Sequence, residues 1–174
     1  AEQNHDMSPF NVGLMYKRGD GVVKNITKTI KFYKLAVEQN YSEAALALGN
    51  LYDFGKDIKQ DALEAVKWYE LAIEMGDISV GYNLGQIYLL GKGLKQSVEK
   101  GMEIHIKYAE KGVLKSINQM GNIYFNELLK PRDIDQALYY YKMGAELNDL
   151  QSQLALGYIY LRGLGVKVNN VLGL

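Results

Sequence analysis

Hydrophobic residues recur along the chain at the spacing of amphipathic α-helices, in short segments that are separated by turns. The clearest two segments cover residues 42–54 and roughly 62–75, and the apolar side chains of each fall on one helical face. Two short helices that are joined by a tight turn form an αα-hairpin. The positions that define the two faces are Ala44, Leu48, Leu51 and Gly55 in the first segment and Ala65, Trp68, Tyr69 and Ala72 in the second.

This pattern is repeated without an insertion or a deletion. A Gly-x-x-Tyr motif occurs five times, and each motif begins 36 residues after the one before it. A strict period of this length is typical of repeat proteins, in which one hairpin cannot bury its apolar face alone and neighbouring hairpins stack. The motif glycines are Gly13, Gly49, Gly85, Gly121 and Gly157.

Residues that begin and end helices follow the same period. One series holds only Asn, Asp and Ser, which are preferred helix N-caps. Asp61 and Asp133 are each followed three residues later by Glu64 and Gln136, which predicts capping boxes. A further series holds Gly or Asn, the residue types that best tolerate the left-handed backbone just past a helix end. The N-cap series is Asn25, Asp61, Ser97, Asp133 and Asn169, and the helix-end series is Asn40, Gly76, Gly112 and Asn148. A turn series, Gly19, Gly55, Gly91 and Gly163, follows the motif tyrosine by three residues.

The motif glycine stands in the middle of a predicted helix, where it costs about 1 kcal/mol against alanine. Its recurrence predicts that a neighbouring helix approaches so closely that a methyl group would clash. Small residues on the second helix, such as Ala36, Ala72 and Gly144, could serve the same approach. We also expect the motif tyrosines to lie between hairpins, with each hydroxyl bonded at the rim.

These features predict an all-α fold, a right-handed α-solenoid of stacked αα-hairpins that forms a single domain over residues 1–174. The predicted repeats cover about 6–41, 42–77, 78–113, 114–149 and an incomplete 150–174.

Composition narrows the classes of function. The chain holds 20 Lys and Arg against 20 Asp and Glu, so it lacks the basic excess that a nucleic-acid-binding protein normally shows. It contains no cysteine, which excludes a disulfide framework, a thiolate zinc site and a cysteine nucleophile. No stretch approaches the roughly 18 apolar residues that a membrane helix needs. We therefore predict neither nucleic-acid binding nor membrane insertion.

The repeated motif resembles that of the Sel-one-like repeat, a relative of the tetratricopeptide repeat. The second repeat carries the resemblance most clearly, in Ala44, Leu48-Gly49, Tyr52 and Gly55, and then in Ala65, Trp68-Tyr69, Ala72 and Gly76. The resemblance covers essentially the whole chain, about four and a half repeats. It implies a non-enzymatic bacterial scaffold that binds a protein or a peptide, and it places the first helix of each hairpin on the concave side.

Adding multiples of 36 to the outward positions of that first helix predicts the residues of a concave binding face. Primary amides are frequent on this face, and each of them offers two donors and an acceptor. A ladder of amides could pair with the backbone of an extended peptide, while aromatic and aliphatic groups hold partner side chains. The few charges among these positions favour a neutral ligand segment. The predicted binding residues are Phe10, Asn11, Leu46, Asn50, Phe54, Tyr82, Asn83, Gln86, Asn118, Gln119, Asn122, Asn126, Tyr158 and Arg162.

Two alternatives stay open for this face and for the function. Asn and Gln on an exposed helix face can simply be solvated, because exposed polar groups need no partner. The scaffold could act as an adaptor that binds a flexible segment, or as an immunity-type or inhibitor protein that wraps and blocks an effector enzyme.

Residue types that carry chemistry are not arranged as a catalytic or metal site. His5 precedes the first repeat, and His105 takes the position that Tyr33, Tyr69 and Tyr141 hold in other repeats, which favours packing over metal binding. The Gly-x-Gly pairs follow a helix rather than a strand, so they are interpreted as turns and not as a phosphate loop. We predict no enzyme activity, no metal and no cofactor.

The ends of the chain give further expectations. Residues 1–5 are expected to be a disordered lead-in, and the fifth repeat stops before its second helix. We expect the native chain to continue, or else another subunit to cover the last helix in a homodimer. The resemblance favours a periplasmic or secreted location, with the cytoplasm as the alternative.

Overall fold

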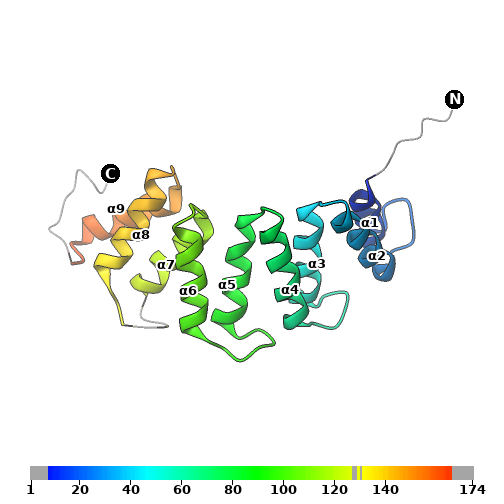
Figure 1. Cartoon of the computed structure of the whole chain (residues 1–174). Helices are drawn as coiled ribbons and strands as arrows, with labels where there is room; N and C mark the ends of the chain where they lie inside the picture. The colour runs from blue at the N-terminus through cyan, green and yellow to red at the C-terminus, as the bar shows by residue number, and fades with distance from the viewer. Residues whose placement is uncertain (1–7, 127–128, 130, 166–174) are drawn as a thin grey trace. The chain divides into compact units, whose positions relative to one another are not determined.

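Paired α-helices make up nearly all of the chain that the computed structural model describes, which is residues 8–126, 129 and 131–165 (Figure 1). These residues contain no β-strand. They fall into two compact units, Ala1–Gln96 and Ser97–Leu174. The helices are α1 (Pro9–Arg18), α2 (Ile26–Glu38), α3 (Ser42–Phe54), α4 (Ala62–Glu74), the 3-10 helix η1 (Ile78–Val80), α5 (Gly81–Leu90), α6 (Val98–Ala109), α7 (Leu114–Phe125), α8 (Ile134–Glu146) and α9 (Leu150–Arg162).

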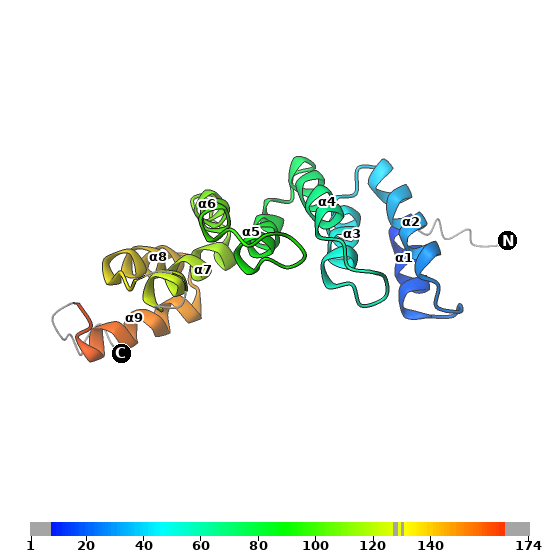
Figure 2. The ribbon, with the colours of Figure 1, turned by 90° about the horizontal axis from the view of Figure 1, so that it is seen from below.

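Each unit is built from helices that pack on their neighbours in chain order. In the first unit α1 pairs with α2 and α3 with α4, and the members of each pair lie side by side in Figures 1 and 2. The α2 helix also contacts α3, and α4 contacts α5. In the second unit α7 pairs with α8, while α6 packs on α7 and α9 packs on α8. Contacts between successive hairpins are what a solenoid requires; a single domain over residues 1–174 stays a prediction.

The predicted caps set the bounds of the second helices. The side chains of Asn25, Asp61, Ser97 and Asp133 each accept a hydrogen bond from the backbone N–H three residues later, at 3.0–3.2 Å. The fifth member of the series, Asn169, lies outside the described residues. The helix-end residues are also confirmed, because both Asn members and all the Gly members have a positive φ.

The capping boxes form only in part. The backbone N–H of Asp61 donates to the carbonyl of Tyr52 at 3.0 Å, and that of Asp133 donates to Tyr124 at 2.8 Å. Because this donor is already satisfied, the carboxylate of Glu64 is not needed as its acceptor and pairs with Lys67 instead. The N-cap residue thus ties the start of the second helix to the end of the first.

A second side chain just before the N-cap closes the same turn. Gln60 donates through Nε2 to the carbonyl of Asp53 at 2.8 Å, and Gln96 donates to Leu89 at 2.9 Å. Arg132 takes this position in the fourth repeat and donates through Nε to Phe125 at 3.0 Å. The last carbonyls of a helix have no partner within it, so these side chains satisfy groups that the helix leaves open.

The motif glycine is required by a tyrosine ring of its own hairpin. A Cβ atom at Gly49 would lie 2.4 Å from ring carbons of Tyr69, which is fully buried. The same approach occurs between Gly13 and Tyr33, at 2.5 Å. The predicted close approach is therefore confirmed, and the group that approaches is the tyrosine twenty residues after the glycine. Further members of this contact are Gly121 and Tyr141, at 2.6 Å.

Two of the motif tyrosines stack on rings of their own hairpin, and a place between hairpins stays a prediction for them. Tyr16 stacks on Phe32 with ring centroids 5.7 Å apart, and Tyr124 stacks on Tyr140 at 5.8 Å. Both partners belong to the second helix of the same hairpin. These tyrosines therefore hold the hairpin together at its turn end, because the stacked ring lies across the two helices.

His105 is fully buried in the second unit, with its Nδ1 3.4 Å from the hydroxyl oxygen of Ser116. This burial confirms that it packs in place of tyrosine. Burial disfavours the charged imidazolium and lowers the pKa of His105 from 6.5 to about 4.

We expect Gly49→Ala to destabilise the chain by about 2 kcal/mol, because overpacking against the Tyr69 ring outweighs the higher helix propensity of alanine. Urea unfolding followed by circular dichroism measures the change. Gly76→Asn is the matched control, since Asn40 and Asn148 hold the same position with positive φ and a Cβ at Gly76 meets nothing within 4 Å. A more stable Gly49→Ala variant would contradict the packing argument.

We expect the free energy of unfolding to decrease as the pH is lowered, because His105 is buried in its neutral form. Its folded pKa of about 4 lies below 6.5, so neutral histidine stabilises the fold above pH 6.5, and this contribution is lost as the pH falls toward 4. The loss amounts to about 2 kcal/mol at pH 5 and about 3 kcal/mol in full. Urea unfolding at pH 7.5 and pH 5 should show a smaller drop for His105→Phe than for the unchanged chain. Equal drops would assign the acid sensitivity to other groups.

Candidate functional site

The predicted binding residues lie on the first helix of each hairpin or just after it, and none of them is fully buried. In the first unit they come from α1, α3 and α5, and in the second from α7 and α9. The half-buried members are Phe10, Leu46, Asn50, Tyr82, Asn83, Gln86, Asn118 and Gln119, and the exposed members are Asn11, Phe54, Asn122, Asn126, Tyr158 and Arg162.

Asn50 is tied into a hydrogen-bond network of the first unit. Its Oδ1 accepts from the hydroxyl of Tyr69 at 2.8 Å and from Nδ2 of Asn83 at 3.2 Å. The Tyr69 hydroxyl also lies 3.2 Å from Oδ2 of the buried Asp53. With its oxygen held by two donors, Asn50 has its amide N–H groups left to offer, and Nδ2 has no acceptor among the residues described.

Asn122 has the same role in the fourth repeat. Its Oδ1 accepts from the Tyr141 hydroxyl at 2.9 Å. Burial raises the pKa of Tyr141 to about 12, so this hydroxyl keeps its proton and donates it. In the first repeat the corresponding position holds Leu14, and the buried hydroxyl of Tyr33 has no hydrogen-bond partner within the described part of the chain.

Asn118 uses both ends of its amide to join α7 to the start of α9. Its Nδ2 donates to Oδ2 of Asp149 at 3.0 Å, and its Oδ1 accepts from the hydroxyl of Ser152 at 2.6 Å. The Ser152 hydroxyl also explains Gly144, where a Cβ would lie 2.0 Å from that oxygen. Glycine is therefore needed here for the packing of α8 on α9.

Several predicted ladder amides therefore bond within the protein. The sequence left two interpretations of these side chains, as ligand contacts or as solvated groups, and neither of them included a structural role. Gln86 also bonds internally, because its Nε2 donates to the Tyr82 hydroxyl at 2.7 Å. Asn126 donates to the backbone carbonyl of Asn122 at 3.0 Å. Binding by the fourteen residues as a set stays a prediction.

The apolar members of the face differ in how much surface they offer. The Phe10 ring stacks on Tyr33 at a centroid distance of 5.2 Å and lies tilted against Tyr41 at 5.0 Å, so much of it packs within the fold. Phe54 is 65% exposed, and the ammonium group of Lys92 lies 5.9 Å from its ring centroid. Among the aromatic side chains of this face in the first unit, Phe54 is therefore the most exposed.

One exposed apolar surface of the second unit lies along α9. Tyr158 is 50% exposed, and its ring meets that of Phe125 edge-on at 6.1 Å, while the guanidinium of Arg162 lies 5.8 Å from its centroid. Contiguous apolar surface of this kind is typical of interaction sites. Its other exposed members are Leu150, Leu154 and Leu161.

A pocket of about 260 Å³ opens beside Asn50 and Phe54 in the first unit. We call it the turn-end pocket, because residues from the ends of α1 and α3 and from the turn after α3 line it. Only Asn50 and Phe54 of its residues belong to the predicted binding face. The charged members lie outside the slots that were assigned to that face, and the signal that could have found them is the clustering of charge at the turns. The full lining is Lys17, Asn50, Leu51, Phe54, Lys56 and Asp57.

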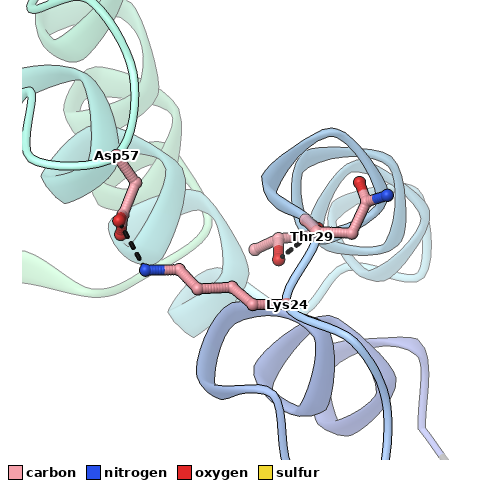
Figure 3. A network of polar contacts seen from close by, with 4 residues as sticks. Lys24, Thr29 and Asp57 are labelled. Carbon is pink, nitrogen blue, oxygen red and sulfur yellow. Dashed lines mark hydrogen bonds and ion pairs between the residues drawn. The ribbon is translucent and has the colours of Figure 1, made fainter.

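An ion pair joins Asp57 of this lining to the turn of the first repeat. Nζ of Lys24, in the turn of the first repeat, lies 2.7 Å from Oδ1 of Asp57, in the turn of the second (Figure 3). The hydrogen bond from Lys24 is the main cause that lowers the pKa of Asp57. Desolvation opposes it, and the charges of Lys56 and Lys17 lower the pKa further. Asp57 therefore stays ionised and paired.

Candidate metal ligands and membrane spans can be assessed over the part of the chain that the structure describes. No three His, Asp or Glu side chains within residues 8–126, 129 and 131–165 are arranged to hold a metal ion. His5 lies outside these residues. Over the same residues, no helix has the length and apolar character that are needed to cross a bilayer.

We expect the buried tyrosine hydroxyls to contribute differently to the free energy of unfolding. Tyr141→Phe removes the bond to Asn122 and should cost about 1 kcal/mol. Tyr33→Phe removes a buried hydroxyl that has no partner among the described residues and should be neutral or stabilising. Urea unfolding midpoints measure both variants, and an equal loss in the two would contradict the assignment.

The chain is similar in sequence and fold to solved structures of other repeat proteins. It is 36% identical to the Sel1 repeat protein from Oxalobacter formigenes, with a TM-score of 0.78, over 95% of this chain and 68% of that one. A protective antigen of uropathogenic Escherichia coli with an SLR fold is 32% identical, with a TM-score of 0.78, over 95% of this chain and 35% of that one. An immunity protein from Pseudomonas aeruginosa is 19% identical with a TM-score of 0.52, over 85% of this chain and 58% of that one, which shows the fold alone. A comparison with curated proteins found no match.

The Sel1 repeat model matches residues 10–41, 42–77, 82–113, 114–149 and 150–174, which is close to the repeats that the sequence predicts. The all-α solenoid class is confirmed by the helices described and by these structural neighbours. The chain belongs to the Sel1 repeat family.

Proposed function

We propose that this chain is a non-catalytic adaptor that binds a partner polypeptide along the first-helix faces of its hairpins. Sel1 repeats generally mediate protein–protein interaction, which supports the class of function. The observation that carries the site is the exposed apolar surface on these helices, with Phe54 on α3 and Tyr158 on α9. Exposed aromatic groups beside polar ones are the usual anchors of an interface.

The amides that are hydrogen-bonded within the protein can still contact a partner, through their N–H groups alone. Asn50 and Asn122 give their oxygens to buried tyrosines, so their N–H groups stand in fixed positions for a partner carbonyl. A group that is already ordered loses less conformational entropy when it binds. The amide positions therefore favour an extended segment whose backbone carbonyls they contact.

An immunity-type or inhibitor role is the second candidate. The same fold occurs in an immunity protein. The exposed side of α9, with Leu150, Leu154, Tyr158 and Leu161, offers a contiguous apolar surface that would suit a folded domain better than a narrow segment. Rescue of cells from a toxin encoded beside this chain would favour this role over the adaptor.

Location and self-association are separate matters. A periplasmic or secreted location stays a prediction. The described residues give no support for a homodimer through the C-terminal end, and the adaptor proposal does not depend on one.

The adaptor proposal is tested by selecting peptides from a random display library on the full chain and measuring their affinity by fluorescence anisotropy. Phe54→Ala and Tyr158→Ala remove one anchor from each unit and should weaken binding by about tenfold or more where their face is used. Leu63→Ala and Tyr139→Ala are matched controls, since both residues are more than half exposed but lie on second helices.

The controls should leave the affinity within about twofold. Selected peptides that respond equally to all four variants would contradict binding through the first-helix faces. Failure to select any peptide, together with toxin rescue, would replace the adaptor with the inhibitor.

A further inference from the structure

We propose that the turn-end pocket of the first unit binds an acidic peptide segment that carries a large apolar side chain. The proposal rests on the adaptor function above and names the chemistry of its ligand at one place. It begins from the pocket lining, which combines an apolar floor with cations and an amide donor.

The size of the pocket fits a side chain rather than a small-molecule ligand. Its volume of about 260 Å³ is below the range of roughly 300–1,000 Å³ that is typical of pockets for drug-sized molecules. Leu51 and the exposed ring of Phe54 supply the apolar surface. One large apolar side chain of a peptide would cover the Phe54 ring and enter beside it.

The polar groups of the pocket are mainly hydrogen-bond donors and cations, so they are suited to a ligand that carries acceptors. Asn50 has its oxygen occupied by Tyr69 and Asn83, so it presents N–H groups. Lys17 and Lys56 act on Asp57 through their charge but form no ion pair within the described part of the chain, whereas the carboxylate of Asp57 is paired with Lys24. With that carboxylate paired, the two ammonium groups and an amide donor around an apolar floor are complementary to carboxylates on the ligand.

The charge of the surrounding turns extends this preference. Residues 17–24, 56–61 and 91–96 hold seven Lys and Arg against three Asp, although the whole chain has no net charge. The turns are neighbours, since Lys24 reaches Asp57, and Lys92 lies over Phe54 from the next repeat. The seven cations are Lys17, Arg18, Lys24, Lys56, Lys59, Lys92 and Lys95.

This surface changes the expected ligand for the first unit. The slots assigned to the concave face hold few charges and favour a neutral segment, but they omit the turn residues that border Phe54. The basic turns instead favour acidic residues next to the apolar anchor, and they should also speed association with an acidic partner at low salt.

The test uses the full chain and four fluorescein-labelled probes in anisotropy titrations. They are a short peptide with one Phe between Glu and Asp residues, the same peptide with Phe→Ser, the same peptide with every acid replaced by Lys, and single-stranded DNA of similar charge. We expect the first probe to bind about tenfold or more tightly than the other three, and to weaken as the ionic strength rises from about 0.05 M to about 0.5 M.

Variants locate the binding. Lys56→Glu and Lys17→Gln should each reduce the affinity for the acidic Phe peptide by about fivefold or more. Lys142→Glu on α8 and Lys31→Gln on α2 repeat the same charge changes at exposed lysines that do not line the pocket, and they should leave the affinity unchanged. Circular dichroism checks that all four variants fold.

Each other outcome overturns the inference. Equal losses in the pocket and control variants would show a general charge effect, and DNA that binds as tightly as the peptide would show an unselective anion surface. If library-selected neutral peptides respond to Phe54→Ala but the acidic Phe peptide does not bind, this inference fails while the adaptor function stands. If neither kind of peptide binds, both fail.

Discussion

The close contact between a buried tyrosine ring and a helix glycine of the same hairpin constrains the rest of this structure. The ring of Tyr69 occupies the space where a side chain at position 49 would lie, and Tyr33 does the same at position 13. A glycine in a helix costs about 1 kcal/mol against alanine, but it lets the paired helix bring a large aromatic side chain into full burial. The recurrence of the pair, twenty residues apart, then fixes how the helices of a hairpin meet.

Burial of the ring also buries a hydroxyl, and this polar group needs a partner. Asn50 and Asn122 follow their glycines directly and accept from Tyr69 and Tyr141. The amide at this position therefore arises from the same contact that selects the glycine. A partner polypeptide would use amides that are already ordered by the fold, so stability and recognition would share these side chains.

Much of the fold could be predicted from the sequence, because caps and helix ends are local. Residues 42–54 form the predicted helix with the predicted bounds, and Asp61 caps the next one through its own side chain. Contacts between different slots could not be predicted in this way. A period shows which residues are equivalent, but it does not show that position 49 meets position 69 or that Asn118 reaches Asp149. The roles of the candidate site residues were therefore less accessible than the helices that carry them.

The turns show why overall charge says little about a local surface. Acidic residues are distributed over the second helices, as in Glu70 and Glu74 on α4, whereas cations collect where the first helices of the first unit end. A cation near the C-terminus of a helix is favoured by the helix dipole, so the fold itself gives a reason for lysine at these positions. Stability alone would be satisfied by cations in contact with the helix ends. It does not account for an exposed phenylalanine among them, since most of the Phe54 side chain is exposed to solvent and does not pack in the core. An aromatic group that is left exposed within a basic border is better explained by a ligand than by folding.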